Sequence, residues 1–153
     1  MSKRRELVFD DQDMVLADVR QLATGEVQVA GSHSFAEIVR HLALTNNMVT
    51  GKTPSPPPLP RYMRLMMPFM RSSILNGPVK PGFKLPVKME AFFWPDDPVE
   101  IGEAVAQLAA SIENYKATGP LDVHPVFGRA TKEQVDRLTL KHAAMHLSFV
   151  RPI

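Results

Sequence analysis

The chain has 153 residues, 18 basic and 16 acidic side chains, a formal net charge of +2 and no cysteine. This length fits a single domain spanning residues 1–153, and the missing cysteines exclude disulfides, thiolate metal sites and a cysteine nucleophile. Basic and acidic residues are interspersed, the N-terminus lacks the apolar stretch of a secretory signal, and no apolar run is long enough to span a membrane. We therefore expect a cytoplasmic protein that binds neither nucleic acid nor membranes.

Two helices are predicted in the first third of the chain. The first covers residues 10–23 and carries an apolar helical stripe that ends before Gly25: Met14, Val15, Val19 and Leu22. The second runs from Ser34 to about Met48, because Ser34 and Glu37 form a capping-box pattern before an apolar-periodic run. Between the two helices, residues 27–29 favour a short extended segment.

A proline-rich stretch follows the second helix. Eleven of the fourteen prolines lie between Pro54 and Pro98. Within this stretch, residues 61–75 form a helical pattern with four methionines, which we interpret as core packing. Pro68 interrupts the pattern, so we expect a broken or irregular helix. A connection this long is either a functional lid or a crossover that wraps a helical bundle, and the sequence leaves both interpretations open.

Two more helices are predicted after the proline-rich stretch. Asp97 and Pro98 are typical of a helix start, and Gly119 and Pro120 of its end; the stripe between them is Ile101, Val105, Leu108, Ile112 and Tyr115. The last helix starts at Thr131, with Gln134 completing a second capping box, and runs to about Val150. The predicted fold is all-α: a four-helix bundle with a long proline-rich crossover between helices two and three. The alternative is an antiparallel up-down bundle with a disordered insert.

Three histidines are candidates for a metal site. His142 and His146 are four residues apart on the last helix, which places both imidazoles on one face, shared with Val135, Leu138 and Phe149. Two imidazoles on an apolar face are costly to bury unless hydrogen bonds or a metal ion satisfy them, and the pair alone leaves both possibilities open.

A third histidine, His41 on the second helix, favours a metal ion over hydrogen bonds as the partner of the pair. It lies seven residues, about 10 Å, after the start of that helix, and His146 and His142 lie about 5 and 10 Å before Phe149. The three histidines share one layer if these two helices are antiparallel, and miss each other by roughly 6–12 Å if they are parallel. A long connection between helices two and three allows those two to run parallel, so that the last helix runs against helix two.

Several segments resemble a known family. They are residues 34–48 with His41, residues 81–86, residues 124–128, and residues 141–147 with His142 and His146. In order and spacing the chain resembles the DinB-like superfamily, also called DinB/YfiT-like, in an uncharacterised branch. The resemblance implies a left-handed four-helix bundle that binds zinc, nickel or a similar divalent ion through His41, His142 and His146. Characterised relatives include transferases and a maleylpyruvate isomerase that use low-molecular-weight thiols. His33 and Val135 stand where this branch often has Trp, which leaves the shape of the pocket open.

The expected function follows from the open coordination positions. Three protein ligands are typical of a catalytic site, and a thiol would have to come from a cosubstrate because the chain has no cysteine. We therefore weigh a metal-dependent thiol transferase or isomerase, with a small-molecule substrate, against a non-catalytic metal- or ligand-binding bundle, because no convincing general base accompanies the triad.

Three other polar side chains could act near the histidines, and one face of the last helix could form an interface. Glu37 lies one turn before His41 and is a candidate partner for a ligand, although its capping role already explains it. His33 is a candidate proton shuttle but fits a hydrogen-bonded loop histidine better, and His124 is expected to be structural. The last helix also carries apolar residues away from the histidine face, which favours a homodimer: Leu140, Ala143, Ala144 and Leu147.

Overall fold

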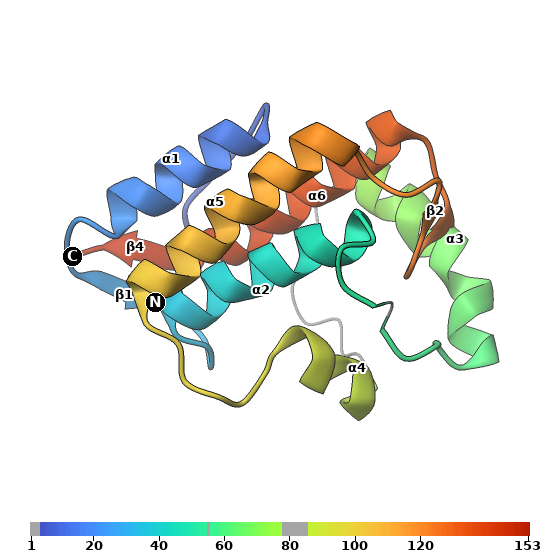
Figure 1. The fold of residues 1–153 in the computed structure, drawn as a ribbon, viewed down its shortest axis with the longest axis horizontal. Helices are drawn as coiled ribbons and strands as arrows, with labels where there is room; N and C mark the ends of the chain where they lie inside the picture. Colours follow the sequence, from blue (N-terminus) through green and yellow to red (C-terminus); the bar gives the residue numbers. More distant parts are fainter. Residues whose placement is uncertain (1–3, 55, 78–85) are drawn as a thin grey trace.

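The computed structural model describes residues 4–54, 56–77 and 86–153, and the part described is mainly helical (Figure 1). Its helices are α1 (Gln12–Leu22), α2 (Phe35–Val49), α3 (Arg61–Asn76), α4 (Val87–Phe93), α5 (Ile101–Thr118) and α6 (Lys132–Leu147). Its short strands are β1 (Val27–Val29), β2 (Val123–His124), β3 (Gly128–Arg129) and β4 (Val150–Pro152). The prediction of a helical fold is confirmed, and residues 27–29 are extended as expected.

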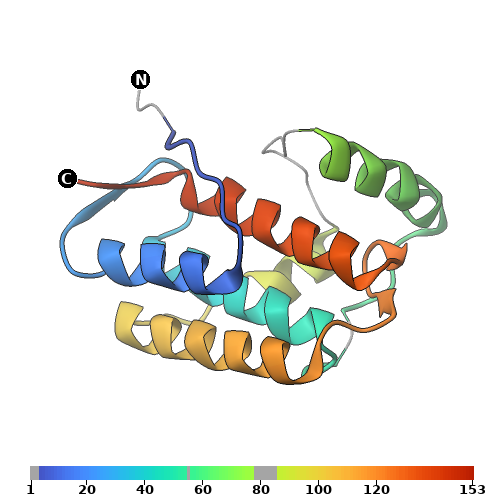
Figure 2. The same cartoon turned by 90° about the horizontal axis from the view of Figure 1, so that it is seen from above.

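Four of the helices share one apolar core. Helix α2 contacts α5 and α6, and α1 contacts the same two helices. Their chain directions can be followed by colour in Figures 1 and 2: α2 and α5 run the same way, and α1 and α6 run against them. The core includes Val19, Val39, Leu108, Ile112 and Leu147, each fully buried. The two helices that carry the candidate ligands, α2 and α6, therefore run in opposite directions.

Both histidine-bearing helices begin at the predicted capping boxes. The Ser34 hydroxyl accepts a hydrogen bond from the Glu37 amide at 3.2 Å, and the Glu37 carboxylate accepts one from the Ser34 amide at 2.6 Å. Thr131 and Gln134 make the same reciprocal pair at 3.1 and 3.0 Å. Because these caps satisfy amides that have no partner inside the helix, they define where α2 and α6 start.

Two predicted helix boundaries were wrong. Helix α5 begins at Ile101, because the Asp97 carboxylate, instead of capping the helix, pairs with the buried Arg40 guanidinium at 3.2 Å. Helix α6 ends at Leu147 and the chain then becomes strand β4, which pairs antiparallel with β1 so that Val150 lies opposite Val29. In both places a contact between distant segments overrides the local pattern.

The proline-rich connection between α2 and α5 contains two helices. Helix α3 is continuous, contrary to the predicted break at Pro68; that proline lies on the exposed face while Met63 and Met67 are buried against the main body. Packing of the methionine side thus outweighs the one backbone hydrogen bond that a proline removes. The packing interpretation is confirmed for Met63 and Met67, whereas Met66 is 52% exposed. Residues 81–85 of the segment noted above lie outside the described residues.

The C-terminal end of α3 is held on α6 by two cations. The Lys141 ammonium donates to the carbonyls of Ile74, Leu75 and Gly77 at 2.7, 3.1 and 2.9 Å, and the Arg137 guanidinium donates to the Leu75 carbonyl at 2.7 Å. These carbonyls have no partner inside the helix, and cations are favourable at the negative end of its dipole.

Candidate metal centre

The three predicted histidines meet between α2 and α6. The Nε2 atom of His142 lies 3.1 Å from Nε2 of His41 and 3.1 Å from Nε2 of His146. One ring nitrogen from each histidine can be chosen so that all three lie within 4.8 Å of one another. His41 is 5% exposed, whereas His142 and His146 keep part of their surface accessible. The antiparallel arrangement that the spacing required is therefore the one that brings the three rings together.

The spacing of the nitrogens fits a single small ion. Imidazole nitrogens bind zinc at about 2.0–2.1 Å, and two such ligands in tetrahedral geometry lie about 3.3 Å apart. The two separations of 3.1 Å are close to that value. The donor set is three neutral nitrogens with no thiolate or carboxylate, which suits zinc, nickel or a related transition metal better than magnesium or calcium.

His41 is held by residues of the proline-rich connection. Its Nδ1 donates to the Phe93 backbone carbonyl at 3.0 Å, and its ring stacks on Trp94 with centroids 3.9 Å apart and an interplanar angle of 6°. Because a carbonyl only accepts, the hydrogen bond places the proton of a neutral His41 on Nδ1 and leaves the Nε2 lone pair facing His142. Phe93 and Trp94 were missed in the sequence; the only signal was that Trp94 is the single tryptophan.

Burial keeps the cluster uncharged. It lowers the pKa of His142 to about 4, and it lowers the pKa of His41 well below its usual value, with His142 as the second cause. The pKa of His146 is lowered first by burial and then by the neighbouring His142 and His41. Neutral imidazoles are the form that binds metals. Two of the three rings have no hydrogen-bond partner outside the cluster among the described residues, and one ion would use all three lone pairs.

The other sequence candidates lie outside the cluster. His33 stacks on the opposite face of Trp94, with centroids 3.7 Å apart, and its Nδ1 lies 4.0 Å from the Glu37 carboxylate. That carboxylate serves the capping box, and the backbone hydrogen bond with Ser34 is the main cause of its lowered pKa. The residue that orients His41 by a hydrogen bond is therefore Phe93, through its carbonyl. Glu37 does not belong to the group of side chains that could hold a metal ion.

His124 has the structural role that the sequence predicted. Its Nδ1 accepts hydrogen bonds from the amides of Val126 and Phe127 at 3.0 and 3.1 Å, inside the turn that joins β2 to β3. Burial lowers its pKa to about 4, with His142 and Arg71 as smaller causes.

The comparisons with known proteins gave a single finding. The family model described as "Protein of unknown function (DUF1569)" matches residues 1–153. Searches among curated proteins and among solved structures gave no match. No helix in the described ranges is both long enough and apolar enough to cross a membrane.

Proposed function

Because the chain belongs to the family described as protein of unknown function DUF1569, we propose a function from the geometry of its own site: His41, His142 and His146 hold one divalent transition-metal ion. The convergence of the three Nε2 atoms, with separations of 3.1 Å on each side of His142, carries this proposal. The neutral state of the rings and the fixed Nδ1 proton of His41 support it, since both are required before three lone pairs can point at one ion.

The fold belongs to the same proposal. We assign the DinB-like four-helix bundle, in which α1, α2, α5 and α6 are the bundle helices and the connection carrying α3 and α4 is the crossover. The helices α2 and α5 run parallel, which supports this assignment. Two parallel helices that follow each other within a bundle need a long connection between them. The connection also supplies Phe93 and Trp94 to His41, so its role goes beyond joining two helices.

Three histidines leave coordination positions for another ligand. An ion there supplies Lewis-acid chemistry toward a group that enters these positions. The chain's own residues supply the rest: His142 and His146 keep part of their surface accessible, whereas His41 and Phe93 are buried and the half-buried Trp94 stacks on His41. Since the chain has no cysteine, a reaction through sulfur takes its thiol from a low-molecular-weight cosubstrate. We propose a metal-dependent thiol transferase or isomerase acting on a small-molecule substrate.

One observation favours a non-catalytic metal- or ligand-binding bundle instead. Among the described residues, which include all sixteen acidic side chains of the sequence, no carboxylate joins the three histidines. Glu37 is occupied at the helix start. A reaction that needs a proton acceptor at the metal would therefore depend on a group brought by the substrate.

Metal content tests the site itself. Protein purified without chelator and then dialysed against zinc or nickel should hold about one ion per chain, and the double variant His142→Ala, His146→Ala should hold none. The matched control is His124→Asn, which removes a histidine outside the cluster and should leave the metal content unchanged. Wild-type protein that stays metal-free after this treatment would disprove the site.

Activity separates the two functions. Metal-loaded protein is incubated with small thiols and electrophilic substrates, beside the His142→Ala variant under identical conditions. A rate that requires thiol, metal and His142 supports the transferase or isomerase. Equal rates for both proteins, while only the wild type holds the ion, would favour the binding protein.

We also propose a homodimer, on a different surface from the one the sequence indicated. Ala143 and Leu147 of α6 are buried in the core of the chain itself. Large exposed hydrophobic residues line one face of α3 instead: Tyr62, Leu65, Met66 and Phe69, between 52% and 79% exposed. Side chains of this size present roughly 500 Å² per chain, hence about 1,000 Å² in a pair, which is the minimum expected of a biological interface. An antiparallel pairing of two α3 helices keeps Arg61 and Arg64 of the two chains apart.

A further inference from the structure

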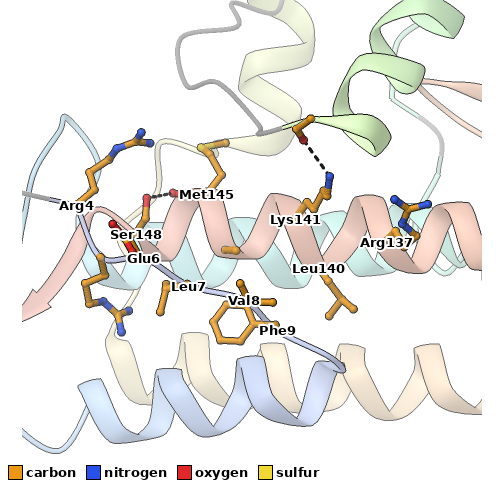
Figure 3. Close-up of a pocket in the computed structure, with 13 residues that line it drawn as sticks. Arg4, Glu6, Leu7, Val8, Phe9, Arg137, Leu140, Lys141, Met145 and Ser148 are labelled. Atoms are coloured by element: carbon orange, nitrogen blue, oxygen red, sulfur yellow. Dashed lines mark hydrogen bonds between the residues drawn. The ribbon is translucent and has the colours of Figure 1, made fainter.

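A second cavity lies away from the metal centre. It has a volume of about 790 Å³ and lies between residues 4–9 of the N-terminal segment, the outer face of α6 and Gly77 at the end of α3 (Figure 3). None of the three metal-site histidines lines it. This volume is within the range of small-molecule sites.

Unpaired positive charge surrounds the cavity. Arg4, Arg137 and Lys141 line it, and none of them lies within 4.0 Å of a carboxylate. This holds for every acidic side chain of the sequence, because all sixteen belong to the described residues. Arg5 also lines the cavity but is neutralised by Asp18 at 2.8 Å. Among the described residues that line the cavity, Glu6 is the only acid, so these residues keep an excess of two positive charges.

The three cations differ in what they can still donate. All three hydrogens of Lys141 are used by carbonyls at the end of α3, so this residue contributes charge alone. Arg137 donates only through Nη2, to the Leu75 carbonyl, which leaves Nη1 and Nε without a partner in the part of the chain described. The Arg4 guanidinium lies 5.2 Å from the centroid of the Phe149 ring, and no hydrogen bond joins it to another described residue. An arginine with free hydrogens is suited to bind a carboxylate.

Between the charged ends the lining is apolar. Figure 3 shows Arg4 toward one end of the cavity, Arg137 and Lys141 toward the other, and Met145 between them, while Leu7, Phe9 and Leu140 lie on the side of α6 that faces α1. Ala144 and Met145 complete this part of the lining on α6. The site therefore offers a hydrophobic surface beside an uncompensated guanidinium, which is the complement of an amphipathic anion.

We propose that this cavity is a binding site for an amphipathic carboxylate, with the carboxylate group on Arg137 and the hydrocarbon part along Leu140, Ala144 and Leu7. Lys141 adds to the local positive potential while it continues to hold the end of α3. The site does not depend on the metal, so it stands or falls separately from the proposed function.

Calorimetric titration of the 153-residue chain with decanoate tests the site. We expect saturable binding with one ligand per chain, no binding of decyltrimethylammonium, and much weaker binding of decanol. Arg137→Gln should weaken decanoate binding by about tenfold or more, because a charge-assisted pair is lost. Ala144→Trp should abolish binding by filling the apolar part. The matched control is Arg20→Gln, which removes an exposed arginine on α1.

Three results would overturn the proposal. They are the absence of saturable decanoate binding to wild type, decanol binding as tightly as decanoate, and equal weakening by Arg137→Gln and Arg20→Gln. Circular dichroism of each variant establishes that the helices are intact. If Ala144→Trp does not fold, Leu140→Asp replaces it, and it should also weaken decanoate binding because it places a negative charge on the apolar lining.

Discussion

The turn histidine His124 makes stability depend on pH in a way that can be calculated. Burial lowers its pKa from the usual 6.5 to about 4, so between these values the unfolded chain binds a proton that the folded chain does not. The neutral form is needed because Nδ1 accepts the amides of Val126 and Phe127, and a proton on Nδ1 would break both hydrogen bonds. The contribution of His124 to the free energy of unfolding is therefore fully present above about pH 6.5, and it is lost as the pH falls toward 4.

The magnitude follows from the two pKa values. Between pH 8 and pH 5 the free energy of unfolding should fall by about 2 kcal/mol on account of His124. The informative variant is His124→Asn, because the amide oxygen of Asn occupies the position of Nδ1 and can accept the same two amides without titrating. The metal-site histidines titrate in both proteins, so the difference between the two proteins isolates His124.

Urea unfolding of both proteins at pH 8 and pH 5, with chelator present, provides the measurement. Wild type should lose about 2 kcal/mol more than His124→Asn over this interval. If the difference in unfolding free energy between the two proteins is the same at both pH values, His124 is not buried in its neutral form and the reasoning is refuted.

Three further predictions concern other parts of the molecule. Trp94→Ala should weaken zinc binding by about tenfold or more in a chelator competition, because it removes the ring stacked on a metal ligand, and Trp94→Phe should recover part of the loss; equal affinity of all three proteins would contradict this. Asp97→Ala should lower the free energy of unfolding, measured in urea, more than Arg40→Met does. The first variant leaves the Arg40 guanidinium, which is 7% exposed, without its counter-ion, whereas the second leaves the Asp97 carboxylate, which is 74% exposed. The reverse order of the two losses would be inconsistent with this difference in burial. Phe69→Asp should convert a dimer into the 17.1 kDa monomer in light scattering, whereas Ile153→Asp, at a residue 84% exposed, should not; a wild type that is monomeric at high concentration would remove the basis for the dimer.

The parts of the structure that local sequence specifies were predictable. The capping boxes at Ser34 and Thr131 fixed the starts of α2 and α6, since each depends on residues only three positions apart. The spacing of His41, His142 and His146 then limited the relative direction of these helices, because only an antiparallel pair brings the three rings into one layer. Helical periodicity and one geometric constraint thus sufficed to locate the candidate metal group.

The parts that depend on distant contacts were not predictable. Asp97 has the local pattern of a helix cap, but its carboxylate is drawn to Arg40, which is 57 positions away. Phe93 and Trp94 reach His41 from the end of α4, a helix of seven residues that is too short for its apolar periodicity to be recognised. The end of α6 was misplaced for the same reason, since strand β4 forms only because its partner β1 lies beside it.

The pairing of β1 with β4 links the two helices that carry the metal ligands. Strand β1 precedes α2, and strand β4 follows α6, so the ladder joins the beginning of one helix to the end of the other. Sliding one helix along its neighbour by a single turn, about 5.4 Å, would separate His41 from His142 and His146. The ladder thus fixes the position of α2 along α6, and with it the spacing of the three histidines. A chain shortened by its last four residues keeps every ligand, yet it should bind zinc less tightly and with a larger loss of entropy, because each binding event would then have to set the helix register that the strands hold in advance.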